Sequence, residues 1–585
     1  MTGWMGRGLE VDLASGACEF AETPERLRTL YVGGRGFGVR LVADRVVAGL
    51  DPFSPDNLLV FAPGPLTGTR TPTSGRHAVV SKSPLTGTIF DCNAGGRFGA
   101  AMKSAGLDYI AITGRAHSPT LLAIDGDQVS LEPAGDLWGA NRSDVLSALS
   151  DRGSVACIGK AGERRALIAA IVHDHRGSAA GRGGLGAVMG SKLLKAIVVR
   201  GERKVSVADE AAFARYLADL MRLLIASPVA SKGLAQYGTA SLVNLINYMR
   251  VMPTSNFRRS QFAGAEAVSG ETIAQSYELR RTPCAACPIG CKRETRDGRE
   301  IPEYETIAMF GPNNDNPDLE SIIQANHLCN EYGLDTISAG AAIACHAELE
   351  GKRLSGAEIL GLVRQMGEGE GVGIDLAQGA RRYACARGAF DAAMQVKGLE
   401  LPGYDPRGVL GLALGYATSN RGGCHLRAYM VGPEIFGKPK LIDRTSWYAK
   451  SWLVALAQNI FTAVDALVVC KFALFTAGEE EFANLLAAVT GLEFPSEDLI
   501  RVGERIWNLE RMFNLREGFS AADDTLPARF FTEDGDERTP RIDRAQFERA
   551  RAEYYAFRGW DAQGRPTEAK LRALSLEQLP CGTRS

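Results

Sequence analysis

Three cysteines that could hold a metal centre occur close together in the segment CAACPIGC, at Cys284, Cys287 and Cys291. The proline and glycine between them suit a loop that folds back around such a centre. Four-iron clusters are usually held by four cysteine thiolates, and structural zinc is also held by sets of four. The best candidate for a fourth ligand is the distant Cys470, in DALVVCKF. A site closed by a remote cysteine favours an iron–sulfur cluster; zinc, or three cysteines that are simply buried, are the alternatives.

Three glycine-rich segments precede these cysteines: GGRGFG at 33–38, NAGGRFG at 93–99 and AGRGGLGAVMGSK at 180–192. A dinucleotide-binding fingerprint would sit between a strand and a long helix, with an acidic residue about 20 positions later. The strand-rich context and the three copies argue against that interpretation. Glycine-rich turns that carry arginine can instead present backbone N–H groups and guanidinium groups to phosphates. Tight turns between strands are the alternative.

The elements that must position these residues form a strand-rich first part and a helical remainder. Residues 1–205 contain many short runs of valine and isoleucine, separated by glycine, proline and aspartate, as is typical of strands. The helical part has a second expected boundary between Pro402 and Gly408. We predict an α+β multidomain fold, with a β-rich N-terminal domain (1–205) followed by two mainly α-helical domains (206–402 and 403–585).

Several helix ends are indicated by capping residues. Asp209 is a good N-cap for a helix in DEAAFARYLADLMRLLIA. In NPDLESIIQANHLCNEYG, Asn316 is expected to cap a helix that ends at Gly333. The next helix should begin at once, at Asp335 or Thr336.

The composition is that of a large globular protein. The 585 residues are 45% hydrophobic and 23% charged, which is far from the profile of a disordered chain. A net charge of −2 provides no basic field for a phosphate backbone, so a nucleic-acid partner is not expected. Twelve cysteines are too few for a disulfide scaffold in a chain of this length.

Nothing in the sequence indicates secretion or membrane insertion. The N-terminal residues MTGWMGRGLEVDLASG lack the apolar core of a signal peptide. The most apolar stretch, 451–478, contains Gln458, Asn459, Asp465 and Lys471, which would be costly in lipid. We therefore expect a core helix followed by a turn here, and a cytoplasmic protein.

Longer segments around these residues follow the pattern of one known family. They read TGTRTPTSGRHAVVSKSPLTG, FDCNAGGRFGAAMKSAGLDYIAITG, AAGRGGLGAVMGSKLLKAIVVRG, CAACPIGCKR, IPEYETIAMFGPN, CNEYGLDTISAG, YDPRGVLGLALGYATSNRGGCHLRAYM and DALVVCKF. In this order, from about residue 30 to 475, they resemble the catalytic subunit of the tungsten-containing aldehyde:ferredoxin oxidoreductase family. The remaining C-terminal segment has weaker signals.

The resemblance implies a cofactor in which two pterin dithiolenes supply four sulfurs to one tungsten, while a magnesium ion links the pterin phosphates. Tungsten then needs no protein thiolate, and the glycine-rich segments would let the backbone approach two flat ligands closely. By similarity, the residues that would contact the pterins are Arg76, Asn93, Gly95, Ala179, Gly181 and Arg182. Arg76 would bind phosphate, and the carbonyls of Asn93 and Ala179 would face magnesium.

A further loop resembles the pterin-binding pattern D-x-x-G-L-[DC] of the family. It runs from Asn330 through Leu334 to Asp335, with asparagine in place of the first aspartate. A pterin N–H would therefore meet an amide oxygen rather than a carboxylate, which weakens a charge-assisted hydrogen bond. Asp335 can also cap the helix that follows it.

A second such loop runs from Asp465 to Cys470, with Val468 and Val469 where the family has Gly-Leu. Asp465 and Cys470 keep the spacing of the pattern. The resemblance would place Cys470 on the four-iron cluster and the backbone of Val469 on a pterin. Electrons would then have a short path from tungsten to the cluster.

The resemblance also points to an acid–base pair. His425, in GGCHLRAYM, lies in the segment that brings a histidine near tungsten in the family, and Arg427 resembles a cofactor contact. Glu305, in PEYETIAMFG, matches the glutamate beside the substrate pocket, and Glu303 is the alternative carboxylate. A lone histidine is otherwise more often a hydrogen-bonding core residue. We expect Glu305 to accept a proton and His425 to donate one.

These features predict a tungsten-dependent oxidoreductase that converts an aldehyde and water to a carboxylic acid and can run backwards with a strong reductant. The [4Fe-4S] cluster would pass electrons to a ferredoxin or an iron–sulfur partner subunit, and we expect an oligomer. One alternative is an aromatic acyl-CoA ring reductase subunit of the same family. The other is a zinc-stapled binding protein without catalysis.

Overall fold

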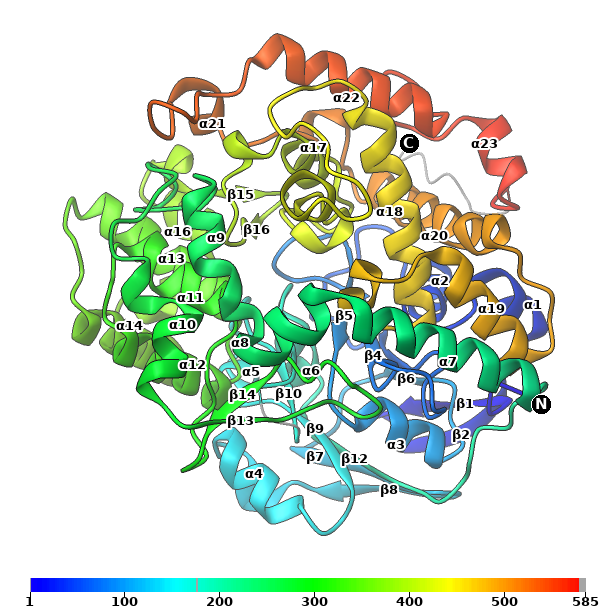
Figure 1. Ribbon diagram of the computed structural model, residues 1–585. Helices are drawn as coiled ribbons and strands as arrows, with labels where there is room; N and C mark the ends of the chain where they lie inside the picture. Colours follow the sequence, from blue (N-terminus) through cyan, green and yellow to red (C-terminus); the bar gives the residue numbers. More distant parts are fainter. Residues whose placement is uncertain (1, 175–176, 578–585) are drawn as a thin grey trace.

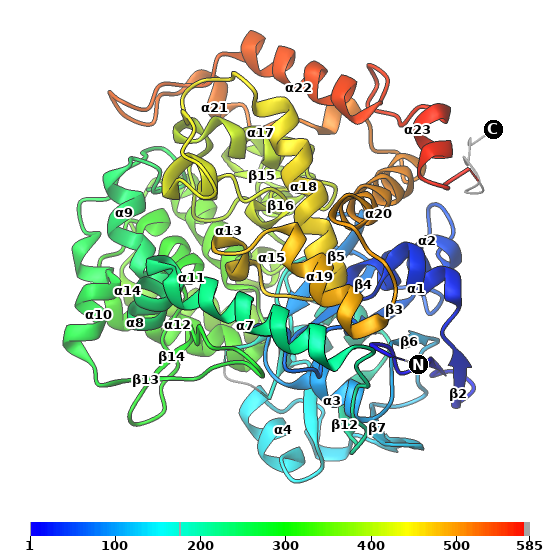
Figure 2. The same ribbon diagram turned by 45° about the vertical axis from the view of Figure 1, so that its right-hand side comes forward.

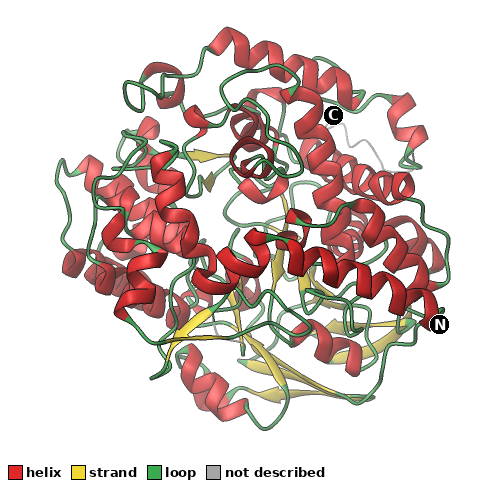
Figure 3. Cartoon of the chain, viewed as in Figure 1, coloured by secondary structure: helices red, strands yellow, loops and turns green. Residues whose placement is uncertain are grey.

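Two six-stranded sheets occupy the N-terminal part of the molecule (Figures 1 and 3). They belong to a computed structural model that describes residues 2–174 and 177–577. The first sheet has the strand order β2-β1-β6-β3-β4-β5, and the second has the order β11-β10-β9-β12-β7-β8. The strands are β1 (Arg7–Asp12), β2 (Ala17–Glu22), β3 (Leu59–Ala62), β4 (His77–Lys82), β5 (Ile89–Ala94), β6 (Ile110–Thr113), β7 (Thr120–Asp125), β8 (Gln128–Pro133), β9 (Ser154–Cys157), β10 (Ile171–His173), β11 (Ala179–Ala180) and β12 (Leu194–Arg200).

Each of these sheets contains one parallel pair, β1 with β6 and β7 with β12, and is otherwise antiparallel. Strands β3 and β4 are buried at every position. A strand that is covered on both faces reads as a continuous apolar run, which is why these two were recognisable in the sequence.

The two sheets meet at their edges. Strand β5 is the last strand of the first sheet, β11 is the first strand of the second, and the two pack against each other. Asn93 lies in β5 and Ala179 lies in β11. The meeting of two edge strands therefore brings two distant glycine-rich segments to one place.

The rest of the chain is mostly helical, so the predicted α+β architecture is confirmed. The predicted domain boundaries remain predictions. The main helices are α2 (Gly34–Arg45), α3 (Phe98–Ser104), α4 (Arg142–Leu149), α7 (Glu210–Ala226), α11 (Tyr304–Phe310), α12 (Leu319–Tyr332), α13 (Thr336–Leu349), α14 (Gly356–Glu368), α17 (Leu410–Thr418), α18 (Lys450–Leu467), α19 (Glu479–Thr490), α20 (Ser496–Arg516) and α22 (Arg544–Arg558). Two short hairpins, β13 (Leu279–Arg281) with β14 (Arg293–Thr295) and β15 (Gln395–Val396) with β16 (Leu399–Glu400), interrupt them.

Two of the predicted helix starts are confirmed. The Asp209 carboxylate accepts a hydrogen bond from the backbone N–H of Ala212 (2.9 Å) at the start of α7. Helix α12 ends at Gly333, which has a left-handed φ of 71°, and α13 follows with Asp335 as its N-cap. This tight turn holds Asp335 at the junction of two helices.

The predicted N-cap of α12 is wrong. The cap is Asp318, whose carboxylate accepts from the backbone N–H groups of Glu320 (3.1 Å) and Ser321 (3.3 Å). Asn316 lies two residues earlier, and its amide donates to the carbonyl of Phe310 (3.2 Å). Both side chains are good caps, and only the path of the preceding turn decides which of them reaches the free N–H groups.

The apolar stretch at 451–478 forms helix α18 and a turn, as predicted. Helix α18 packs against α20 and α22 (Figure 2). Its buried Gln458 and Asn459 accept hydrogen bonds from the Arg558 guanidinium (2.6 and 2.5 Å) on α22. In the part of the chain that the structure describes, no helix is both long and apolar enough to cross a membrane.

Candidate functional site

One cavity between the sheets and the helices is lined by every residue that the sequence predicted for the site. The residues are Arg76, Asn93, Gly95, Ala179, Gly181, Arg182, Cys284, Cys287, Cys291, Glu305, Asn330, Leu334, Asp335, His425, Arg427, Asp465, Val469 and Cys470. They come from strands, turns and helix ends that lie up to hundreds of residues apart. The structure thus brings all of them together.

The cysteine loop and Cys470 are joined through Thr73. The backbone N–H of Cys470 donates to the carbonyl of Thr73 (3.1 Å), and the N–H of Thr73 donates to the carbonyl of Ala286 (2.7 Å) in the cysteine loop. A further backbone bond runs from the N–H of Ala285 to the carbonyl of Gly96 (3.0 Å). The remote cysteine is therefore held against the loop by backbone contacts.

The thiols themselves are partly enclosed. Burial raises the pKa of Cys287 to about 11, so metal binding here must displace protons. Zinc would need ligands that converge on one point at about 2.0–2.3 Å. Among the described residues, no three His, Cys, Asp or Glu side chains converge in this way.

Arg76 holds Asn93 in place beside the cysteines. Its Nε donates to the Asn93 side-chain oxygen and its Nη2 to the Asn93 carbonyl (2.8 Å). A Cβ at Gly95 would lie only 2.9 Å from Cys284 Sγ and 3.0 Å from Arg76 Nη1, so a larger residue would displace these two side chains. Arginine, backbone and thiol therefore meet with no side chain between them.

Arg182 is engaged by the protein on three sides. Its Nε lies 3.2 Å from Asp335 Oδ2, its Nη1 donates to the carbonyl of Gly423 (3.0 Å) and its Nη2 to that of Glu400 (2.7 Å). Around Gly181, by contrast, an added Cβ would meet only Asp335 Oδ1, at 3.8 Å. Arg182 fixes Asp335, whereas Gly181 leaves open space at the cavity wall.

Asn330 lies beside a carboxylate that the sequence pattern did not reveal. Its amide donates to Glu300 Oε2 (2.7 Å), and Glu300 Oε1 pairs with Arg142 (3.0 Å). This bond uses one of the two Asn330 amide hydrogens and leaves its oxygen free to accept a hydrogen bond. Glu300 has no recognisable motif and could not be identified from sequence.

The second loop, from Asp465 to Cys470, turns at Val468 with a left-handed φ of 61°. Its counterpart Gly333 has the same kind of turn without a side chain. A Cβ at Gly34 would lie 2.2 Å from Val468 Cγ2, so the missing side chain of Gly34 makes room for the valine. The space at Gly34 accommodates the valine side chain, while its left-handed φ leaves backbone strain at this turn.

Asp465 is surrounded by cations. Lys471 Nζ lies 2.7 Å from both of its carboxylate oxygens, Arg35 Nη1 lies 3.2 Å from Oδ2 and Arg427 Nη1 lies 3.3 Å from the same atom. Arg427 also pairs with Asp91 (2.7 Å). These buried charges compensate one another, as buried ions must.

Glu305 and His425 are in contact. His425 Nε2 lies 3.3 Å from Glu305 Oε1, and the N–H of Gly403 donates to Glu305 Oε2 (2.8 Å). Burial raises the pKa of Glu305 to about 8. Burial and the cations of Arg182 and Arg421 lower the pKa of His425 well below its usual value. At neutral pH the pair therefore carries a protonated carboxyl and a neutral imidazole. Glu303 is half-exposed and lies 3.6 Å from Lys292 Nζ.

Three neighbours of this pair were not predicted from sequence. Tyr404 and Tyr429 hydrogen-bond to each other through their hydroxyls (2.9 Å), and their rings lie 5.5 and 5.7 Å from that of His425. Burial would raise the pKa of Cys424, but nearby arginines, led by Arg421 at 2.8 Å, lower it to about 6. Its place beside His425 in GGCHLR is the signal that could have identified it.

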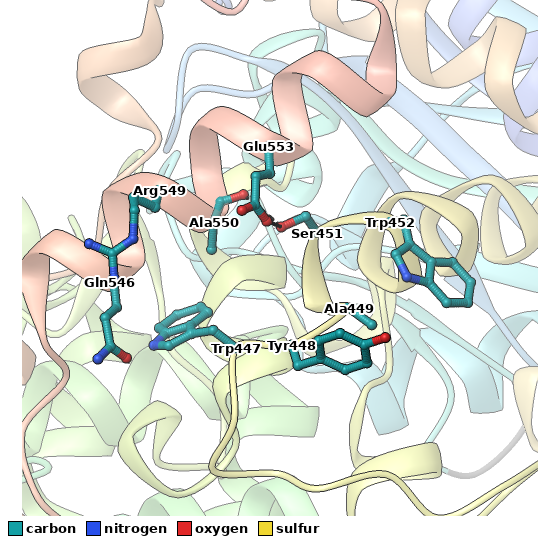
Figure 4. Close-up of a pocket in the computed structure, with 9 residues that line it drawn as sticks. All are labelled: Trp447, Tyr448, Ala449, Ser451, Trp452, Gln546, Arg549, Ala550 and Glu553. Atoms are coloured by element: carbon teal, nitrogen blue, oxygen red, sulfur yellow. Dashed lines mark hydrogen bonds between the residues drawn. The ribbon is translucent and has the colours of Figure 1, made fainter.

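A second pocket lies between the start of α18 and helix α22 (Figure 4). It is lined by Trp447, Tyr448 and Trp452 together with Glu553 and Arg549. None of the predicted site residues lies in it. The predicted site residues line the first cavity instead.

Several known proteins are similar to this chain in sequence and in fold. Residues 8–201 match the family model of the aldehyde ferredoxin oxidoreductase N-terminal domain, and residues 215–576 match that of domains 2 and 3. The chain is 41% identical to the tungsten-containing aldehyde ferredoxin oxidoreductase of Pyrococcus furiosus, over 99% of this chain and 100% of the relative. The corresponding protein of Thermococcus kodakarensis is also 41% identical, with the same coverage.

A solved structure is similar over almost the whole length. It is the active site complex BamBC of benzoyl coenzyme A reductase with 1,5-dienoyl-CoA, with a TM-score of 0.84 and 25% identity, covering 99% of this chain and 98% of that one. The two family matches together span most of the sequence, and the full-length identities agree with them. This chain therefore belongs to the aldehyde ferredoxin oxidoreductase family of oxidoreductases.

Proposed function

We propose that this protein oxidises aldehydes to carboxylic acids at a tungsten bis-pterin cofactor and releases the electrons through a [4Fe-4S] cluster. The supporting observation is that the Glu305–His425 pair, the four cysteines and the glycine-rich segments line one cavity. An aldehyde and water give a carboxylic acid, two electrons and two protons. The electrons would leave singly to a ferredoxin or an iron–sulfur partner subunit.

Metal analysis and a dye assay test this proposal. The purified holoprotein should contain tungsten and about four irons per chain, because a four-thiolate site holds a four-iron cluster. It should reduce a viologen dye when an aldehyde is added. Zinc without tungsten or iron would contradict the proposal.

The cavity walls suit a flat, anionic ligand. Arg421 Nε and Arg427 Nε are buried and have no hydrogen-bond partner, although both side chains line the cavity. Buried donors of this kind are costly unless a ligand satisfies them. Gly95 and Gly181 line the cavity with backbone that carries no side chain. The edge strands that carry Asn93 and Ala179 pack against each other beside the cavity. Arg76 and these residues would hold the pterins and magnesium.

The protein's own part in the reaction is proton transfer. The cofactor supplies a two-electron acceptor for the aldehyde carbon. Glu305 is oriented by the N–H of Gly403, and it must lose its own proton before it can accept one from water. Because burial and nearby cations keep His425 neutral, it is not the cationic proton donor expected from the sequence; its Nε2, 3.3 Å from the carboxyl, would orient Glu305 instead. In the reverse direction the protonated Glu305 is the donor.

The rate of aldehyde oxidation should rise with pH through about 8, the pKa to which burial raises Glu305. Oxidation needs the deprotonated carboxylate, which is the minor form below this pH. Carboxylic acid reduction needs the protonated form and should decline over the same range. Turnover at saturating substrate between pH 6 and 9.5 would check this. A flat oxidation profile would show that Glu305 is not the titrating group.

Arg76→Ala should lower the tungsten and pterin content while iron stays near four per chain. The guanidinium would bind phosphate and also holds Asn93, so its loss should weaken cofactor affinity by about 10- to 100-fold. Arg76→Lys should recover only part of this, since lysine cannot form the two-pronged contact. Arg70→Ala is the matched control, because Arg70 is exposed in the same segment. Unchanged tungsten in Arg76→Ala would remove this residue from the cofactor site.

The similarity to benzoyl coenzyme A reductase favours a second candidate, reduction of an aromatic acyl-CoA ring by the same kind of site. The 41% identity to aldehyde oxidoreductases exceeds the 25% identity to that structure, which favours the first. Incubation of the reduced holoprotein with benzoyl-CoA separates the two. Formation of a dienoyl-CoA product would support the second candidate, and aldehyde-dependent dye reduction without it would support the first.

A further inference from the structure

We propose that the outer side of the cysteine loop is the docking face for a small acidic protein that carries one electron at a time. The loop is residues 282–292, and Arg97, Arg281 and Lys232 form the cationic rim of this face. The inference rests on the proposed function, because it requires electrons to leave through the four cysteines. It adds the surface at which the acceptor binds and the charge that this acceptor must present.

Arg281 and Arg97 are tied directly to the loop. Arg281 Nη2 donates to the carbonyls of Pro288 and Ile289, both at 2.8 Å, so its guanidinium lies on the loop itself. Arg97 follows Gly96, whose carbonyl accepts the N–H of Ala285 (3.0 Å). Both arginines are exposed.

Lys232 belongs to the π-helical turn η2 (Val229–Leu234), which lies against the same loop. The buried Arg293 bridges the two, since its guanidinium donates to the carbonyl of Leu234 (3.1 Å) and to that of Gly290 (2.5 Å). The turn also packs against the 3₁₀ turn that follows Cys470. Lys232 is exposed, on a segment that contacts both parts of the four-cysteine site.

The three rim cations differ from their neighbours in having no acidic partner. Arg280 pairs with Glu294, and Arg296 pairs with Glu278 (3.0 Å). No carboxylate in residues 2–174 and 177–577 forms an ion pair with the rim side chains. Unpaired surface cations attract an acidic partner and accelerate its encounter.

The centre of the face allows close approach. Ala286 and Pro288 are exposed at the tip of the loop, directly beside Cys287. Electron transfer weakens steeply with distance, so a partner must come close to the cysteines. Small apolar residues ringed by cations suit a complex that forms and separates quickly, because charge speeds the encounter and little surface is buried.

The test is the double variant Arg97→Glu/Lys232→Glu, which reverses two rim charges but leaves Arg281 and its loop contacts intact. The control is Arg549→Glu, at the second pocket in Figure 4. Arg549 is also exposed, and it lies on α22, at the opposite end of the molecule from the β13–β14 hairpin and α3 (Figures 1 and 2). The probe is an acidic [4Fe-4S] ferredoxin. Its binding to each holoenzyme is measured by calorimetry, and its reduction is measured at 20–300 mM salt.

The double variant should bind ferredoxin about tenfold or more weakly at low salt, and its KM for ferredoxin should rise similarly. Salt screens exposed charges beyond about 10 Å, so it should weaken ferredoxin binding to the wild type and to Arg549→Glu. It should weaken binding to the double variant much less, because only Arg281 of the rim cations remains there. Turnover with saturating viologen and the iron content should be unchanged. Equal affinity and equal salt dependence in all three proteins would overturn the proposed face. Absence of aldehyde-dependent viologen reduction in the wild type would instead overturn the proposed function, while calorimetry would still test the face.

Discussion

Glu305→Gln should lower the turnover of aldehyde oxidation by about 10²-fold or more, with tungsten and iron content unchanged. Glutamine keeps the size of the side chain and can still accept the N–H of Gly403, so the geometry of the site should persist. It cannot accept a proton from water. The rise of the oxidation rate through pH 8, where burial places the pKa of Glu305, should disappear with it. Steady-state turnover and metal content of the same preparations would check both effects.

His425→Asn should also reduce turnover, because it removes the imidazole that lies 3.3 Å from the Glu305 carboxyl and orients it. Glu303→Gln is the matched control, since its carboxylate faces Lys292 and is half-exposed. If Glu303→Gln lost turnover while Glu305→Gln kept it, the proton acceptor would be Glu303 and the assignment of Glu305 would be wrong. Normal turnover in His425→Asn with its metals intact would make His425 a core histidine.

Cys470→Ala should lose the iron–sulfur cluster as completely as Cys287→Ala does. A four-iron cluster needs a thiolate at each corner, and the backbone bond from Cys470 to Thr73 holds this cysteine against the loop that carries the other three. The brown colour, the iron content and the visible spectrum of the purified protein would report the loss. Electron transfer to ferredoxin should stop with it.

Cys385→Ala is the control for this experiment, because Cys385 is exposed and lies outside the cavity. It should retain full iron content. If Cys470→Ala also kept full iron content and an unaltered spectrum, the assignment of the fourth ligand would be wrong. The three cysteines of the loop would then need another partner.

Local pattern was enough to predict the elements near the site. Valine- and isoleucine-rich runs such as HAVVSK form strands because their side chains pack on both faces of a sheet, and Asp209 and Asp335 cap helices through their own carboxylates. These are short-range effects. Asn316 shows their limit: two good caps lie two residues apart, and the turn before the helix selected Asp318.

Motif resemblance went further than local pattern and identified residues that the fold gathers into one cavity. It singled out Cys470 and Asp465, which line the cavity, because their spacing from each other is kept. It could not identify Glu300, which reaches Asn330 from a different segment, or Tyr404 and Tyr429, which meet only in the folded chain. Contacts between distant segments produce no recognisable spacing pattern in the sequence.

The sequence by itself determined the family and the α+β architecture, and it singled out the cysteine, glycine, glutamate and histidine residues that line the cavity, because these depend on residue type and spacing. Only the tertiary structure decided the electrostatics. Glu305 is an ordinary carboxyl in the sequence, and burial raises its pKa to about 8. His425 becomes neutral because burial and the cations of Arg182 and Arg421 disfavour its charged form. Desolvation and charge act through space, so the protonation states of this pair exist only once distant segments have packed around it.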